Sequence, residues 1–233
     1  FGDGFESGGL GQWETVSGLV VQSAVVRSGG FAVRQTSSGS ATYAYKHLPG
    51  TYDELWISGW VYIASHSTSV NLFGFRSSSG GSIVNVYVDS RGLLSLRNNA
   101  GGVTTYSTTV VPVGSWHYVV LHAVVNGSSS SLDVTFDGVA VPELALTGQN
   151  LGTKPIARVQ LGETSTGRTY DVIIDDLLVS TTPVDASGGG GTPPGDPPSD
   201  PPGEPSGLFG DGFESGGLGQ WETVSGLVVQ SAV

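Results

Sequence analysis

The first 25 residues of the chain recur, letter for letter, at its end. Residues 1–25 and residues 209–233 both read FGDGFESGGLGQWETVSGLVVQSAV. An identity of this length at a fixed offset indicates one complete repeat unit followed by the opening of the next. The fold must therefore lie within residues 1–208, because a 25-residue segment cannot bury a core of its own. Tandem arrays of this kind are typical of structural or adhesive extracellular proteins, and we interpret the chain as a window of a longer one.

Residues 1–185 read as short strands separated by Gly/Ser turns, and no stretch has the apolar spacing of a helix. We predict strands over 18–25, 31–36, 41–47, 54–64, 69–76, 82–88, 92–97, 103–108, 116–126, 131–137, 155–162 and 170–180. Strands at this spacing with no helices between them predict an all-β fold, a two-sheet antiparallel jelly-roll sandwich.

A Pro/Gly-rich linker follows the predicted sandwich at residues 186–208. Its tetrads PPGD, PPSD and PPGE favour polyproline II geometry, which at ~3.1 Å per residue lets the linker span roughly 70 Å. Two interpretations stay open: a stiff spacer between beads, or an ordered strap laid along a fibre. The start of the next repeat, 209–233, comes directly after it.

Composition excludes several classes of partner. The formal net charge is −11, lysine occurs only at Lys46 and Lys154, and no stretch is locally basic. We therefore expect no nucleic-acid partner and no anionic lipid surface. No apolar run has the length of a membrane span, so we expect no membrane insertion. The lack of cysteine excludes a disulfide scaffold but does not identify the compartment. The repeat pattern leads us to expect a secreted or cell-surface location.

Three motifs carry a family resemblance. They are FESGGLGQW at 5–13, SGGFAVR at 28–34 and IDDLLV at 174–179. Together they resemble motifs of extracellular jelly-roll modules of the carbohydrate-binding type. The stretch 114–162 is similar to the laminin-G and concanavalin-like jelly rolls. The resemblance covers nearly all of 1–181, and it implies a fold more firmly than it implies a ligand.

The same resemblance implies a structural Ca²⁺ site. Its ligands would be Glu6, one of Asp175 and Asp176, and a main-chain carbonyl near Gly29, with Asp3 as an extra ligand. Hard oxygen ligands of this kind suit Ca²⁺. Strand alternation sends the two adjacent aspartates to opposite faces, and a buried carboxylate is costly unless it is paired. The alternative is a set of carboxylates hydrogen-bonded to main-chain amides, with no metal.

The predicted strand 54–64 places two kinds of side chain on its two faces. One face is aliphatic, with Leu55, Ile57, Gly59, Val61 and Ile63. The other is aromatic, with Trp56, Trp60 and Tyr62. An aromatic row can stack against sugar rings and form a glycan platform, but such rows are more often part of a core.

We expect no enzymatic activity. The jelly-roll glucanases that the fold resembles place paired carboxylates at alternating positions of one strand, and this chain has no such run. Asp53 and Glu54 are adjacent residues at a turn, and no nucleophile motif stands out from the Gly/Ser background.

These features predict a non-catalytic structural or adhesive module of an extracellular filament, with other copies of itself as partners. In one version, covalent repeats form the filament. In the other, 209–233 takes the place of 1–25 in a neighbouring molecule, as in strand donation, through Phe209, Phe213, Glu214 and Trp221. The alternative function is a carbohydrate-binding module repeated for avidity on polysaccharide.

Overall fold

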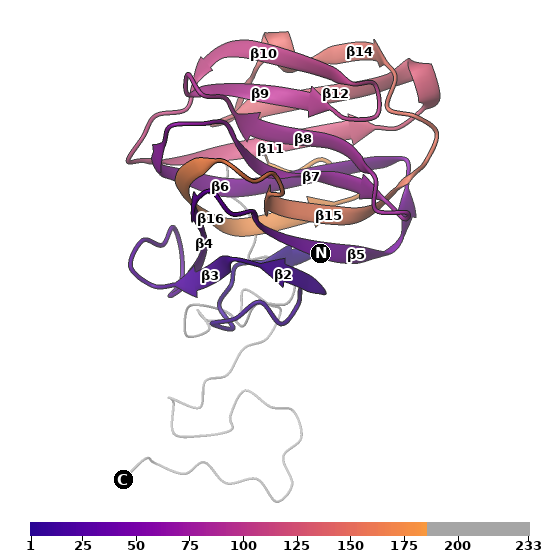
Figure 1. Cartoon of the computed structure of the whole chain (residues 1–233). Helices are drawn as coiled ribbons and strands as arrows, with labels where there is room; N and C mark the ends of the chain where they lie inside the picture. The colour runs from indigo at the N-terminus through magenta and orange to yellow at the C-terminus, as the bar shows by residue number, and fades with distance from the viewer. Residues whose placement is uncertain (186–233) are drawn as a thin grey trace, which may run out of the picture. The chain divides into compact units, whose positions relative to one another are not determined.

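Two antiparallel β-sheets packed face to face make up residues 1–185, the part of the chain that this computed structural model describes (Figure 1). In Figure 1 the seven-stranded sheet faces the viewer and the nine-stranded sheet lies behind it. The two-sheet sandwich expected from the strand pattern is confirmed. The predicted linker and the second copy of the opening segment lie outside the described residues.

The seven-stranded sheet has the order β10-β9-β8-β7-β15-β5-β2. Its strands are β10 (Val103–Val110), β9 (Leu93–Asn98), β8 (Ser82–Val88), β7 (Val70–Ser77), β15 (Ile156–Glu163), β5 (Thr42–Tyr52) and β2 (Thr15–Ser17).

The nine-stranded sheet has the order β13-β12-β11-β6-β16-β4-β3, with β1 beside β16 and β14 beside β12. Its strands are β13 (Val139–Ala140), β12 (Ser130–Phe136), β11 (Trp116–Val124), β6 (Glu54–His66), β16 (Thr169–Ser180), β4 (Ala32–Ser38), β3 (Leu19–Gln22), β1 (Gly2–Asp3) and β14 (Leu146–Gln149). Two 3₁₀ turns, η1 (Gly127–Ser129) and η2 (Pro142–Leu144), complete the described chain.

Each of the predicted strands has a counterpart in the structure, and the remaining elements are short. Alternation is the reason for this agreement, because residues that face the core recur at every second position of a strand. The short strands β1, β2, β13 and β14 were not predicted. Two to four residues are too few to show a period of two. Among the described residues no helix is long and apolar enough to cross a membrane.

The opening segment joins both sheets. β1 pairs with β16, β2 pairs with β5, and β3 pairs with β4, so the first 22 residues extend the two layers at the same end of the sandwich. Two side chains from this segment, Phe5 and Trp13, are buried in the core. Phe5 has a φ of 65°, in the left-handed region that bulky residues rarely adopt. Its burial holds the backbone there.

Candidate functional site

Polar residues on the outer face of the seven-stranded sheet line up across the strands. One row joins Tyr45, Gln160, Gly74, Asn85, Arg97 and Thr104 on six neighbouring strands. A second row joins Asn71, Tyr87, Ser95 and Tyr106. On the central strands β15, β7 and β8, the residues that alternate with them are apolar side chains of the core. The sheet thus presents a continuous polar surface several strands wide.

This surface is hollowed over β7, β8, β9 and β10. A hollow of about 310 Å³ is lined by Ser69, Asn71, Asn85, Tyr87, Arg97, Asn99, Thr104, Glu163, Ser165 and Arg168. A second, of about 360 Å³, shares Ser69 and Tyr87 with the first and adds Asp89, Ser90, Arg91 and Tyr106. We call the two together the polar groove. Its lining of amide, hydroxyl, guanidinium and phenol groups can donate and accept many hydrogen bonds.

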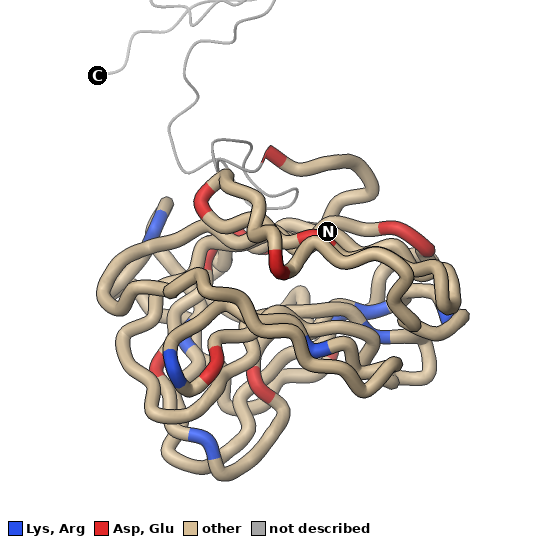
Figure 2. The backbone as a smooth tube through the Cα atoms, turned by 90° about the horizontal axis from the view of Figure 1, so that it is seen from above, with Lys and Arg blue, Asp and Glu red and all other residues tan. Residues whose placement is uncertain are grey.

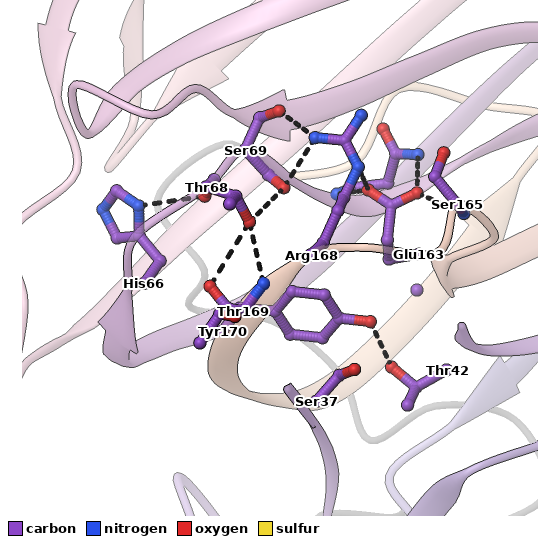
Figure 3. Close-up of polar contacts among 12 residues, drawn as sticks. Ser37, Thr42, His66, Thr68, Ser69, Glu163, Ser165, Arg168, Thr169 and Tyr170 are labelled. Atoms are coloured by element: carbon purple, nitrogen blue, oxygen red, sulfur yellow. Dashed lines mark hydrogen bonds and ion pairs between the residues drawn. The ribbon is translucent and has the colours of Figure 1, made fainter. Parts of the chain in front are cut away.

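Glu163 is the buried anchor at one end of the polar groove. Only 1% of its side chain is exposed, and its carboxylate accepts hydrogen bonds from the main-chain N of Asn71 (3.0 Å), the Asn71 amide (3.2 Å) and the main-chain N of Ser165 (2.7 Å). Arg168 Nε lies 3.4 Å from the same carboxylate. Figure 3 shows Arg168 extending between Glu163 and Ser69. Arg168 Nη1 donates hydrogen bonds to the carbonyl and hydroxyl oxygens of Ser69. Both carboxylate oxygens thus have partners within the protein, and they connect the strands and the loop that line this end of the groove.

Asp89 plays a similar part at the other end. Its carboxylate accepts hydrogen bonds from the main-chain N of Arg91 (2.8 Å) and of Leu93 (3.0 Å), and from the Arg91 guanidinium (2.9 and 2.6 Å). Burial raises the pKa of Asp89, but these hydrogen bonds lower it more, so the net pKa lies below the ordinary value. The Arg91 side chain is 60% exposed, while that of Asp89 is 6% exposed. The groove therefore presents the cation of this pair to solvent.

Two tyrosines form the apolar part of the groove. Burial, and then the neighbouring Tyr106, raise the pKa of Tyr87 to about 12, so its phenol stays protonated at neutral pH. Tyr106 is 55% exposed, and the Arg91 guanidinium lies 5.1 Å from its ring centroid. An exposed ring beside hydrogen-bonding groups can contact the apolar face of a sugar ring.

The predicted aromatic row lies on the opposite side of the molecule, on the outer face of the nine-stranded sheet. Trp56, Trp60 and Tyr62 are half-buried, and the aliphatic residues that alternate with them are in the core. One face of the Trp56 ring is stacked on His122 at 4.1 Å, and the Arg27 guanidinium lies 4.1 Å from the Trp60 ring centroid. These contacts occupy one face of each tryptophan, which leaves less ring surface for a sugar.

The residues of the predicted Ca²⁺ site meet around the turn at 27–31. Glu6 accepts hydrogen bonds from the main-chain N of Gly30 (2.8 Å) and of Phe31 (3.1 Å). Gly29 has a φ of 58°, and a Cβ added there would lie 2.4 Å from the Glu6 carboxyl carbon. Glycine at 29 therefore lets the carboxylate approach the backbone.

The two adjacent aspartates take different positions at this turn. Asp175 is fully buried, and its carboxylate accepts hydrogen bonds from the main-chain N of Arg27 (2.9 Å), of Ser28 (3.3 Å) and of Asp176 (2.9 Å). Burial raises its pKa to about 7. Asp176 is half-buried, has a φ of 49°, and accepts hydrogen bonds from the Ser28 hydroxyl. The ladder register shifts between Asp175 and Leu178, so the expected alternation is interrupted here, and both carboxylates contact the same 27–28 turn.

Asp3 forms hydrogen bonds with other residues of the opening segment. It is fully buried, and its carboxylate accepts hydrogen bonds from the main-chain N of Phe5 (2.8 Å) and from the Trp13 indole (2.8 Å). Among residues 1–185 no three Asp, Glu, His or Cys side chains converge on one point. The carboxylates around the 27–31 turn accept hydrogen bonds from N–H and O–H donors. The Ca²⁺ site stays a prediction.

The predicted assembly residues Phe209, Phe213, Glu214 and Trp221 lie outside the described residues. Their counterparts in the first copy, Phe1, Phe5, Glu6 and Trp13, all contact the sandwich: Phe5 and Trp13 belong to the core, Phe1 packs against it, and Glu6 holds the 27–31 turn.

Sequence analysis did not predict the polar groove. Its residues come from five strands and four loops, and each alone is an ordinary polar residue in a turn or at an outward strand position. Strand order decides which of these positions become neighbours, and sequence periodicity does not reveal strand order.

The family model described as the concanavalin A-like lectin/glucanases superfamily matches residues 35–187. The chain belongs to this superfamily. The match confirms the resemblance drawn from the sequence. It begins within β4, so the opening segment with β1, β2 and β3 lies outside the matched region. No curated protein matches the chain.

Solved structures share the fold at low sequence identity. Cip1, a cellulose-induced protein, has 16% identity and a TM-score of 0.64, over 79% of this chain and 98% of its own. A sialidase from Trypanosoma rangeli has 13% identity and a TM-score of 0.53, over 72% of this chain and 28% of its own. Another sialidase has 12% identity and a TM-score of 0.53, over 79% of this chain and 18% of its own. The chain thus spans about a quarter or less of the sialidases it resembles, and the likeness shows the fold alone.

Proposed function

We propose that the chain is a non-catalytic carbohydrate-binding unit of a secreted or surface-displayed protein, and that it binds polysaccharide in the polar groove. The observation that carries this proposal is the continuous row of amide, guanidinium and phenol side chains across the seven-stranded sheet. Ligand sites combine a few placed polar groups with apolar surface, and the groove supplies both. Membership of a superfamily named for lectins and glucanases supports the same conclusion.

We propose a non-catalytic role because the two carboxylates of the groove are buried and hydrogen-bonded. Glu163 and Asp89 are buried, and their oxygens accept hydrogen bonds from main-chain N–H groups and ion-pair with arginine. A general acid or base in a glycosidase needs a carboxyl group that can reach the glycosidic oxygen or a water molecule. The two carboxylates instead have structural partners on several sides.

Affinity electrophoresis against a panel of soluble polysaccharides, with pull-down on insoluble ones, tests this proposal. Tyr106→Ala removes an exposed ring from the groove and should weaken binding at least tenfold without lowering Tm. Trp56→Ala, on the opposite sheet, is the matched control and should bind like the wild type. Loss of binding in Trp56→Ala alone would move the site to the aromatic row. No retention on any polysaccharide would refute the proposal, and release of sugar from a bound polymer would refute its non-catalytic part.

We propose as a second function that the repeated opening segment links copies into a filament. Three observations support it. Residues 209–233 are identical to 1–25, and the first copy supplies the buried side chains Phe5 and Trp13 to the core. The region matched by the family model, 35–187, does not include residues 1–25. The second copy can bind where the first copy packs in a neighbouring molecule, if that neighbour's own first copy is displaced.

Light scattering of the full chain and of a chain that ends at 208 tests this second function. Filaments or oligomers formed only by the full chain would support linkage through 209–233. Phe213→Ala should abolish assembly and leave the Tm of the monomer unchanged, because its counterpart at 5 still fills the core. Monomers from both chains would refute assembly in trans and leave a covalent array as the remaining version.

A further inference from the structure

The arginines of this acidic protein gather on one face. The chain has seven, and five of them, Arg76, Arg91, Arg97, Arg158 and Arg168, lie on the seven-stranded sheet or in the loops at its edge. Figure 2 shows most basic positions on the side of the sandwich away from the N-terminus, and acidic positions crowded near it. The outer face of the seven-stranded sheet is therefore locally positive in a molecule of net charge −11.

Within residues 1–185, three of these arginines have no anionic partner. Among residues 1–185, ion pairs are made by Arg91 and Arg168 but not by Arg76, Arg97 or Arg158. Arg97 donates from Nη1 to the Gly102 carbonyl (3.1 Å) and the Thr104 hydroxyl (2.8 Å), which fixes its guanidinium in the groove. These acceptors are neutral, so no carboxylate of the described residues compensates the positive charge of Arg97.

Arg76 and Arg158 lie directly opposite each other on β7 and β15. Like charges in this cross-strand position repel each other. The Nε atoms of both are buried and have no hydrogen-bond partner within the described chain, which adds a desolvation cost. The side chains are held by neutral groups, Arg76 by Gln160 (2.5 Å) and Arg158 by the Ser78 carbonyl (2.8 Å). A negative charge placed over this pair would offset both costs.

We infer that the polysaccharide bound by this face is acidic, a polymer whose sugars carry carboxylate or sulfate groups. The inference rests on the proposed carbohydrate function and adds its substrate class. Planar guanidinium groups pair with such anions through two parallel hydrogen bonds. Arg97 within the groove and the Arg76–Arg158 pair beside it lie in neighbouring rows of the same sheet, so one chain crossing the strands can carry anions to both.

Affinity electrophoresis in polygalacturonate, dextran sulfate and uncharged dextran, at low and at physiological salt, tests the inference. Wild-type protein should be retarded by an acidic polymer, more strongly at low salt. Arg97→Gln and the double variant Arg76→Gln/Arg158→Gln should each weaken retardation at least tenfold. Arg97→Lys keeps the charge but not the planar fork, and should fall between wild type and Arg97→Gln. Arg27→Gln removes one arginine from the opposite sheet and should behave as wild type.

The outcomes separate this inference from the function on which it rests. Binding to polygalacturonate but not to dextran sulfate assigns carboxylates, and the reverse assigns sulfates. Binding to a neutral polysaccharide that Arg97→Gln leaves intact would overturn the acidic ligand and keep the carbohydrate function. Equal loss in Arg27→Gln would show a general charge effect and overturn the inference, as would stronger retention by duplex DNA than by any polysaccharide. Circular dichroism of each variant checks that it is folded.

Discussion

The burial of Phe5 in a left-handed backbone conformation makes a sharp prediction about stability. The side chain is fully buried, and φ at this residue is 65°. Replacing a buried phenylalanine by alanine costs about 3 to 5 kcal/mol. Alanine keeps a Cβ, so it keeps the strain of the left-handed conformation, which is about 1–2 kcal/mol for a residue other than glycine. Phe5→Ala should therefore lower the free energy of unfolding by about 4 kcal/mol.

Phe5→Gly separates the two contributions. It removes the same ring but relieves the strain, because glycine adopts positive φ readily. We expect Phe5→Gly to be about 1 kcal/mol more stable than Phe5→Ala, although in an ordinary strand glycine is less stable than alanine by about 0.5–1 kcal/mol. The order of the two variants is thus the opposite of the usual one.

Urea unfolding followed by circular dichroism measures both values, in a background that carries Phe213→Ala so that the second copy cannot fill the vacated place. Val20→Ala, in the same segment but at a position 59% exposed, is the control and should change stability by less than about 0.5 kcal/mol. A cost below about 1 kcal/mol for Phe5→Ala would refute the docking of the opening segment. A glycine variant less stable than the alanine variant would refute the strain argument.

Three further variants or conditions have expected outcomes. Gly74→Ala puts a Cβ 2.2 Å from the Val84 carbonyl oxygen, so urea unfolding should show a loss of about 1–3 kcal/mol, and wild-type stability would contradict the contact. Trp13→Phe removes the indole N–H that donates to buried Asp3. Calorimetry should show a free energy of unfolding lower by about 1–3 kcal/mol. Burial raises the pKa of Asp175 to about 7, so folded protein keeps a proton that unfolded protein releases near pH 4. The Tm measured in EDTA should therefore fall from pH 4 to pH 7. A Tm that does not change with pH would contradict the raised pKa. Recovery of the Tm on adding calcium would support the predicted Ca²⁺ site.

Much of the architecture follows from the sequence alone. Alternation in segments such as 54–64 and 82–88 predicts strands, because a half-buried strand must place apolar side chains at every second position. The same alternation separates the aliphatic face of 54–64 from its aromatic face, and the structure has them on opposite sides as predicted. The motifs at 5–13, 28–34 and 174–179 form one group in the sequence analysis, and their carboxylates hydrogen-bond to the 27–31 turn at different points along it.

The tertiary structure alone decided where the polar groove and its arginines lie. Arg97, Arg158 and Arg168 are far apart in a chain without any basic stretch, so composition predicted no positive surface. The strand order β9-β8-β7-β15 brings them to one face, and that order depends on pairing between β7 and β15, which are far apart in the sequence. A period of two tells which residues point outward from a strand, but it carries no information on which strand lies beside it. The local pattern thus determined the layers, and strand pairing determined the polar groove.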